Sequence, residues 1–335
     1  MESDTALQIV RLGWPDACWS GASAVPVRSG RLSDQPLWRI DTDKAQFALR
    51  GWANSDLPRA EAASKLVTHI SRQASLRVPV PLATGGRFAS LLYPAGGFHW
   101  ELAPWLEGEA DFAAHPSCER LEAMCRALAE LHLTAADLPA PEQPLAIRRH
   151  FEALADLQQA GQHGHFSRLD SRELPVKCPV GPDWGAALLR GVEVARQQLA
   201  PLQAVPLAGQ WTWGDAWHNN FLLVDEQVTG VVDFATARID TPMADLARLL
   251  GSTTVEHRDW WAGGIRAYAA LRPLSEVESR AVGALCASGT VLSLANWLRW
   301  LGIERRVFAA PRAACDRMSH FALRLTHLLR EANTT

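Results

Sequence analysis

The sequence of 335 residues lacks the signals of several protein classes. Its six cysteines include no C-x-x-C pair, which leaves zinc ribbons and disulfide frameworks unsupported. We find no apolar run of about 18 or more residues to span a membrane, and no basic-then-apolar N-terminus to direct export. A net charge of -3 and a pI near 6.4 give no basic field for nucleic acid. We therefore expect reduced cysteines, a cytoplasmic location, and neither nucleic acid nor membrane as a partner.

Two common nucleotide-binding patterns are also missing. Neither a Walker-type G-x-x-x-x-G-K-[ST] nor a strand-anchored G-x-G-x-x-G occurs, so P-loop and Rossmann chemistry lack their usual sequence support. The hydrophobic content of 48% is enough for two cores in a chain of this length. No internal repeat, low-complexity tract or long linker divides the chain, so one unit of two lobes is the simplest organisation.

An acid, an amide and a second acid follow one another in the second half of the chain. Asp215 lies five residues before Asn220, and Asp233 follows two short apolar runs, 221–224 and 228–232. The runs predict a tight hairpin that brings Asp233 back beside Asn220. Phosphoryl transfer needs an acid to orient the acceptor hydroxyl and accept its proton, together with oxygen ligands for magnesium. The three residues suit these roles, although each alone is also a common turn or strand-end residue.

Three linked motifs are present: Gly214-Asp215 with Asn220, then Asp233-Phe234, then Asp245-Leu246-Ala247. In this order they resemble the aminoglycoside phosphotransferase and choline kinase-like family, small-molecule relatives of the protein kinases. The resemblance implies an α+β, protein-kinase-like fold with a small antiparallel-sheet N-lobe and a larger, mainly helical C-lobe. It divides the chain into a nucleotide-binding lobe (1–102), a hinge (103–108) and a C-lobe with the catalytic loop and acceptor pocket (109–335).

The resemblance also implies roles for the motif residues. Asp215 is the expected catalytic base, while Asn220 and Asp233 are expected to hold Mg²⁺ for an ATP or GTP co-substrate. Asp245 is expected to fix the catalytic loop through the loop backbone, from the start of the next helix. Trp213 stands where the family usually has histidine, and it could brace the loop by packing instead.

The nucleotide phosphates need a cation from the N-lobe. Apolar runs at 37–41 and 46–52 predict a hairpin, and in the family its second strand carries a lysine that grips the phosphates. Arg50 occupies the matching position, and its planar fork suits phosphate. Lys44 competes for the role but falls in the predicted turn. Glu61, on the following helix, is the expected partner of Arg50, or else a first-turn acid that favours the helix dipole.

Other nucleotide contacts follow from the resemblance. Ser33, in a loop before the first of these strands, is expected to donate to a terminal phosphate, unless the loop is an ordinary surface turn. The Ala103 carbonyl and the Trp105 amide are the expected adenine contacts at the hinge, which is otherwise a plain linker. Leu222 and Val232 are expected to pack beneath the adenine.

Some features are open to more than one interpretation. His132 lies on an apolar helical stripe and is expected to be a hydrogen-bonded core residue. His218 either positions substrate or braces the catalytic loop. Residues 145–201 belong to the acceptor pocket by resemblance, but their charges favour neither sign of acceptor. Four tryptophans form part of a substrate wall or, as we prefer, of the core: Trp260, Trp261, Trp297 and Trp300.

The principal hypothesis is a kinase that phosphorylates a hydroxyl of a small molecule of the aminoglycoside, choline, homoserine or sugar type. One alternative is a catalytically silent nucleotide-binding protein that acts through partners, which the departures at Arg50 and Trp213 favour slightly. A weaker alternative is a metal-dependent hydrolase that uses the same acids without an acceptor.

Overall fold

The computed structural model describes residues 2–333 except 16, 18, 28–34, 86–89, 143–144, 164–173, 175–182 and 254, and except the side chains of Val255 and Glu256. Ser33 and its loop therefore lie outside the described residues. The four described cysteines, Cys118, Cys125, Cys286 and Cys315, are free.

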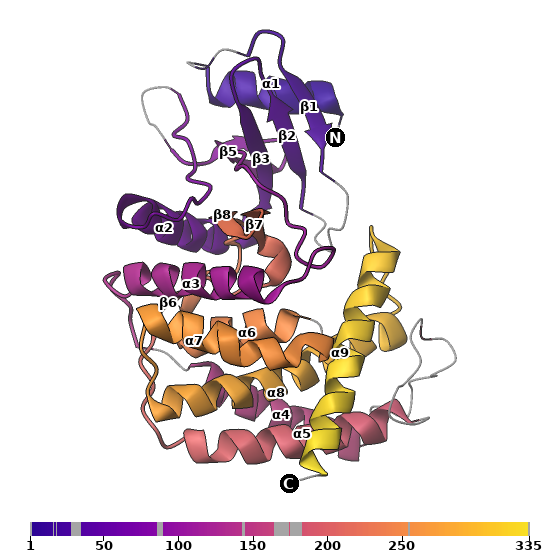
Figure 1. The fold of residues 1–335 in the computed structure, drawn as a ribbon. Helices are drawn as coiled ribbons and strands as arrows, with labels where there is room; N and C mark the ends of the chain where they lie inside the picture. Colours follow the sequence, from indigo (N-terminus) through magenta and orange to yellow (C-terminus); the bar gives the residue numbers. More distant parts are fainter. Residues whose placement is uncertain are drawn as a thin grey trace.

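A five-stranded antiparallel sheet occupies one end of the molecule, at the top of Figure 1, with strand order β1-β2-β3-β5-β4. Its strands are β1 (Ser23–Pro26), β2 (Leu37–Asp41), β3 (Gln46–Ala53), β4 (Tyr93–Ala95) and β5 (Phe98–Pro104). In β2, Trp38 and Ile40 are buried while Leu37, Arg39 and Asp41 are partly exposed, which is the two-residue period of a strand. Helices α1 (Ser3–Gly13) and α2 (Leu57–Gln73) accompany the sheet.

The predicted β2–β3 hairpin is confirmed, with its turn between Asp41 and Gln46. The next strand, β4, begins at Tyr93, and 86–89 lie outside the described residues. The turn that follows is formed by Gly96 and Gly97, which take φ of 59° and 79°. Glycine adopts these left-handed values without steric cost.

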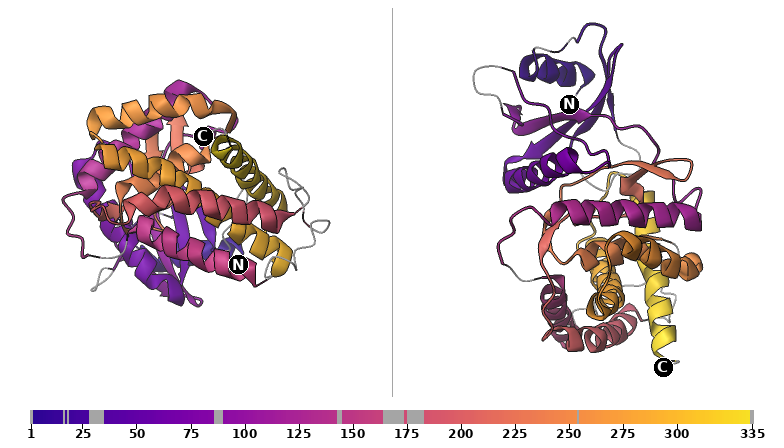
Figure 2. Two further views of the ribbon diagram at one scale, coloured as in Figure 1. Left: turned by 90° about the horizontal axis from the view of Figure 1, so that it is seen from below. Right: turned by 60° about the vertical axis from the view of Figure 1, so that its left-hand side comes forward.

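The rest of the chain is mainly helical, as predicted, and Figure 2 shows the helices gathered beyond the sheet. Its helices are α3 (Cys118–Ala135), α4 (Ala146–Gln162), α5 (Trp184–Leu199), α6 (Pro242–Ser252), α7 (Trp261–Leu271), α8 (Glu276–Leu298) and α9 (Pro311–Ala332). Between α5 and α6 lie two antiparallel strand pairs: β6 (Gln210–Thr212) with β9 (Arg238–Asp240), and β7 (Phe221–Val224) with β8 (Gln227–Val231). A capping box formed by Ser275 and Glu278 begins α8.

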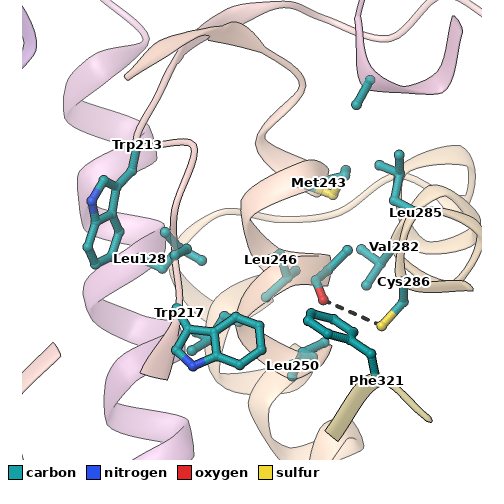
Figure 3. Close-up of a cluster of buried hydrophobic side chains, with 14 of the residues drawn as sticks. Leu128, Trp213, Trp217, Met243, Leu246, Leu250, Val282, Leu285, Cys286 and Phe321 are labelled. Carbon is teal, nitrogen blue, oxygen red and sulfur yellow. Dashed lines mark hydrogen bonds between the residues drawn. The ribbon is translucent and has the colours of Figure 1, made fainter. Parts of the chain in front are cut away.

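The larger hydrophobic core joins the strand pairs to the helices. Helix α8 packs on α4, α5, α6 and α9. Figure 3 shows the part nearest the motif residues, where Trp213 and Trp217 lie with Leu246 from α6 and Phe321 from α9. The segment that carries the first motif is thus anchored in the core.

The four C-terminal tryptophans belong to this core or pack against it, which was the interpretation preferred from the sequence. Trp297 is buried, while Trp260, Trp261 and Trp300 are partly buried and pack against the core.

The run Glu276–Ile303, which contains α8, is long and apolar enough to cross a membrane by length and composition alone. The sequence analysis had found no such run. However, 67% of the apolar 18-residue stretch within it is buried inside the protein, as in a core helix of a soluble protein. The cytoplasmic location stays a prediction.

The core near the motif predicts a large effect of truncation at Leu246, which is fully buried. We expect Leu246→Ala to lower the free energy of unfolding by roughly 2–5 kcal/mol, because it removes buried methyl groups and leaves a cavity. Leu133→Ala, at a position 47% exposed on α3, is the matched control. Urea unfolding of both variants measures the effect, and equal losses would contradict this description of the core.

Candidate active site

The loop after β6 is fixed by one buried carboxylate. Asp245, in the first turn of α6, accepts a hydrogen bond from the Trp213 amide at 2.8 Å and from the Gly214 amide at 2.9 Å. Its side chain is 1% exposed. The carboxylate thereby satisfies two backbone donors that would otherwise be buried without partners. The predicted structural role of Asp245 is confirmed.

Gly214 is required by the backbone of this loop. It takes φ of +83°, and a Cβ atom at this position would lie 2.2 Å from the Thr236 carbonyl oxygen. A larger residue would therefore be strained and would displace the segment after Asp233.

Trp213 braces the loop by packing, as predicted. The side chain is fully buried, stacks on Phe234 and meets Phe221 edge-on. The indole Nε1 also donates to the Asp233 carbonyl at 2.9 Å. Packing and this hydrogen bond together tie the first motif to the second.

Two histidines support the same unit. His132 is fully buried and bonds Tyr268 through Nδ1 at 2.7 Å and Asp245 through Nε2 at 3.3 Å. It is the hydrogen-bonded core residue that the sequence predicted, and burial lowers its pKa. His218 Nδ1 donates to the Ser252 carbonyl at 2.8 Å, so this side chain braces the loop against the end of α6.

Asp215, Asn220 and Asp233 converge as the hairpin prediction required. The Asn220 amide nitrogen donates to the Asp215 carbonyl at 3.0 Å and to Asp215 Oδ2 at 3.2 Å. The Val232 amide donates to the Asn220 carbonyl at 2.9 Å, which places Asp233 beside the loop. Burial raises the pKa of Asp215, the nearby Arg248 charge opposes this, and the Asp233 charge adds to it.

Arg50 connects the sheet to these acids. Its Nη2 lies 3.1 Å from Asp233 Oδ1, and its guanidinium lies over the Trp52 ring at 4.3 Å from the centroid. Gln35 accepts two further hydrogen bonds from Arg50. The competing Lys44 is exposed in the β2–β3 turn, as expected. Of the two basic candidates, the structure brings Arg50 to the motif residues.

The structure does not bring Glu61 to Arg50. Glu61 is exposed on α2, and within the described part of the chain it forms no ion pair. The carboxylate beside Arg50 is Glu101, its direct partner in the β3–β5 register. Burial raises the pKa of Glu101 to about 7, against the opposing charge of Arg50. The sequence analysis missed Glu101 because only the strand register reveals this pairing.

The hinge prediction needs correction at Trp105. Its amide donates to the Gln46 carbonyl at 2.9 Å and extends the β3–β5 ladder, so it does not face a ligand. Ala103 pairs with Ala48 in the same ladder. Because hydrogen-bonded and non-hydrogen-bonded pairs alternate between antiparallel strands, the Pro104 carbonyl and the Leu106 amide face away from β3.

The two residues predicted to pack beneath the adenine belong to the β7–β8 hairpin or follow it directly, near the hinge segment 103–108. Leu222 is half-buried on β7 and Val232 is half-buried just after β8. A Cβ atom on Gly108 would lie 3.2 Å from Leu222 Cβ, which shows how closely the linker approaches the hairpin. The lobe boundaries at 102 and 108 stay predictions.

The donor atoms suit magnesium. No group of three or more His, Cys, Asp or Glu side chains that could hold a metal occurs among the described residues. Mg²⁺, however, is commonly held by one or two carboxylates together with substrate phosphates and water. The Asp233 carboxylate and the Asn220 amide oxygen provide such a set, since the Asn220 nitrogen is already bonded to Asp215.

A model of the phosphotransferase enzyme family matches residues 23–277. A homoserine kinase of Methylobacterium radiotolerans is 26% identical over 256 residues, which cover 74% of this chain and 71% of that protein. A homoserine kinase of Methylocella silvestris is 29% identical over 215 residues, which cover 58% of this chain and 56% of that protein.

Solved structures share the fold at low identity. A microcompartment-associated aminopropanol kinase superposes with a TM-score of 0.69 at 16% identity, covering 98% of both chains. A spectinomycin phosphotransferase in complex with ADP and spectinomycin gives 0.67 at 11% identity, covering 98% of this chain and 99% of that one. The GDP complex of aminoglycoside 2'-phosphotransferase-IIIa gives 0.64 at 16% identity over the whole of both chains. These likenesses confirm the predicted kinase-like fold.

The role of Asp245 predicts a loss of loop order on Asp245→Asn. An asparagine offers one acceptor oxygen, so one of the two backbone amides loses its partner, at a cost of roughly 1–3 kcal/mol. We expect lower stability in urea and faster hydrogen exchange in the segment 211–216. Asp137→Asn, at an exposed position, is the control. Unchanged exchange in that segment would contradict the role of Asp245.

The buried histidines predict acid sensitivity. Burial lowers the pKa of His150 to about 4 and of His320 to about 3. In the unfolded chain both histidines bind a proton from about pH 6.5 downward, whereas in the folded chain they stay neutral to lower pH. Their contribution to the free energy of unfolding is therefore fully present above about pH 6.5 and is lost as the pH falls. We expect His320→Gln, whose amide can still donate to the Gly251 carbonyl, to reduce the slope of unfolding free energy between pH 6 and 5 by about 1.4 kcal/mol per pH unit. An unchanged slope would refute this assignment for His320.

Proposed function

The chain belongs to the phosphotransferase enzyme family, and we propose that it transfers the γ-phosphoryl group of magnesium-bound ATP or GTP to a hydroxyl of a small molecule, with Asp215 as the base. The observation that carries this proposal is the convergence of Asp215, Asn220 and Asp233 in one loop and hairpin. The kinase relatives and neighbours support the same reaction class.

Asp215 is the group that handles the acceptor. Its carboxylate orients the acceptor hydroxyl and accepts the proton as the hydroxyl oxygen bonds to the γ-phosphorus. The bond from that phosphorus to the β–γ bridging oxygen breaks, and the nucleoside diphosphate leaves. Asn220 holds one Asp215 oxygen through its amide nitrogen, which leaves the other oxygen for the acceptor.

Asn220 and Asp233 would hold the magnesium ion, which when bound neutralises charge on the nucleotide phosphates. Arg50 contributes the fixed positive charge of the N-lobe. It bonds Asp233, and its planar fork suits a phosphate of the nucleotide. Glu101 is the direct cross-strand neighbour of Arg50. Ser33 stays the predicted donor to the terminal phosphate.

The nucleotide base would lie between the linker and the hairpin. The Pro104 carbonyl and the Leu106 amide are the natural hydrogen-bonding pair, in place of the Ala103 and Trp105 groups first expected. Leu222 and Val232 provide the apolar surface beneath it. Backbone contacts of this kind suit either purine, so ATP and GTP stay alternatives.

Asp215→Asn tests the proposed base. We expect the acceptor-stimulated rate to fall by about 10²–10⁴-fold, because the amide cannot accept the hydroxyl proton. The affinity for nucleotide should stay within about twofold, since Asp215 acts in transfer and not in ground-state binding. Turnover is measured with Mg-ATP and Mg-GTP across hydroxyl compounds, and nucleotide affinity by titration of a fluorescent diphosphate.

Asp225→Asn, in the exposed hairpin turn, is the matched control for this substitution. Full stimulated activity of Asp215→Asn would exclude Asp215 as the base. Nucleotide binding by the wild type without stimulation by any acceptor would favour the catalytically silent alternative.

A further inference from the structure

Arginine side chains gather on one side of Asp215. Arg248, one turn after Asp245 on α6, places Nη1 at 3.5 Å from Asp215 Oδ1. Asn220 bonds the other oxygen, Oδ2, so Arg248 lies on the side away from the proposed metal ligands. Arg317, on α9, is near enough for the charges of Asp215 and Arg248 to act on it.

A small cavity of about 50 Å³ opens on this side. Among the described residues that line the cavity there is no carboxylate, and four are basic: Arg238, Arg248, Arg324 and His150. The aromatic rings of Trp217 and Phe321 also line it. Asp215 does not line the cavity itself, but Arg248, which contacts Asp215, and Trp217, two residues after it, both do. Its walls come from α4, α6, α8 and α9.

Some of these arginines already have partners. Arg238 shares the buried carboxylate of Asp240 with Arg149. Arg324 donates to the backbone carbonyls of Gly251 and Cys286. These two side chains of the lining are thus held by the protein itself.

Arg248 and Arg317 are less well compensated. The contact of Arg248 with Asp215 is long, at 3.5 Å. Arg317 stacks on the Trp217 ring, with Cζ at 3.8 Å from the centroid, and within the described part of the chain it forms no ion pair. Burial lowers the pKa of Arg317 to about 10, so keeping this cation on the Trp217 ring, which lines the cavity, costs desolvation energy. Two positive charges therefore face one carboxylate, Asp215.

We propose that the phosphoryl acceptor is a small hydroxy acid, whose carboxylate is bound by Arg317 and Arg248 while its hydroxyl lies at Asp215. The inference rests on the proposed function, because it assigns a substrate class to the same site. Planar guanidinium groups match a carboxylate bidentately, and Arg317 lies on the Trp217 ring, two residues after Asp215.

The same charges disfavour polycationic acceptors. An aminoglycoside or a quaternary ammonium compound would bring positive charge against Arg248 and Arg317, without an acidic wall to receive it. The charges of 145–201 favoured neither sign of acceptor in the sequence, and the arginines of α6 and α9 resolve this ambiguity.

The test compares matched acids and amides. Homoserine, 4-hydroxybutanoate and glycerate are each paired with their primary amides, and choline and kanamycin serve as cationic acceptors. Stimulated turnover is measured with magnesium nucleotide, and binding of each compound by calorimetry in the presence of magnesium and nucleoside diphosphate. We expect at least one acid to exceed its amide in kcat/KM by roughly tenfold to hundredfold, the effect of hydrogen bonds to a charged group.

Arg317→Gln should remove this preference, lowering kcat/KM for the acid by a similar factor relative to kcat/KM for the amide. Arg317→Lys should keep part of it, and Arg312→Gln, exposed on the same helix, should keep all of it. An acid preference that survives Arg317→Gln in a folded variant would overturn the proposed role of Arg317.

The outcomes separate the two proposals. Equal use of acid and amide, no binding of any acid, or better use of choline or kanamycin would overturn the hydroxy-acid inference and leave the kinase intact. Binding of an acid that depends on Arg317, with no phosphorylation of any compound, would support a carboxylate-binding site at Arg317 and contradict the proposed function.

Discussion

The carboxylate of Asp245 is the constraint on which the rest of the site depends. It is buried at the start of α6, and it accepts the backbone amides of Trp213 and Gly214. His132 on α3 forms hydrogen bonds with both Asp245 and Tyr268 on α7, so helices α3, α6 and α7 are linked to the same loop. Side chains placed by a buried network of this kind have little freedom to move, which is what a reaction that depends on positioning requires.

A second constraint links the two halves of the site. Arg50 comes from the sheet and bonds Asp233, which follows the hairpin of the helical part. Asp233 is itself held in a left-handed conformation, with φ of 61°, and its carbonyl accepts from Trp213. A residue other than glycine at such φ is uncommon and is often found at functional sites. The Arg50–Asp233 pair therefore joins the sheet to the hairpin at the proposed site.

The sequence was most informative where the chemistry is local. Asp215, Asn220 and Asp233 lie in one loop and one hairpin, so turn residues and apolar runs suffice to predict their proximity. The same is true of the β2–β3 hairpin that carries Arg50. Glu101 could not be found this way, because its approach to Arg50 depends on the register of β5 on β3. For the same reason the sequence could not show that the Trp105 amide donates a hydrogen bond to the Gln46 carbonyl. Arg248 and Arg317 lie on helices far apart in the chain, and only their packing around Trp217 brings them to Asp215.

The most direct test is a crystal structure of the chain with Mg²⁺ and a non-hydrolysable ATP or GTP analogue. We expect a cation bound by the Asp233 carboxylate and the Asn220 amide oxygen, a terminal phosphate facing Asp215, and Arg50 in contact with a phosphate. A cation or nucleotide bound away from these residues, with only the Arg50–Asp233 pair present, would contradict this assignment of the site.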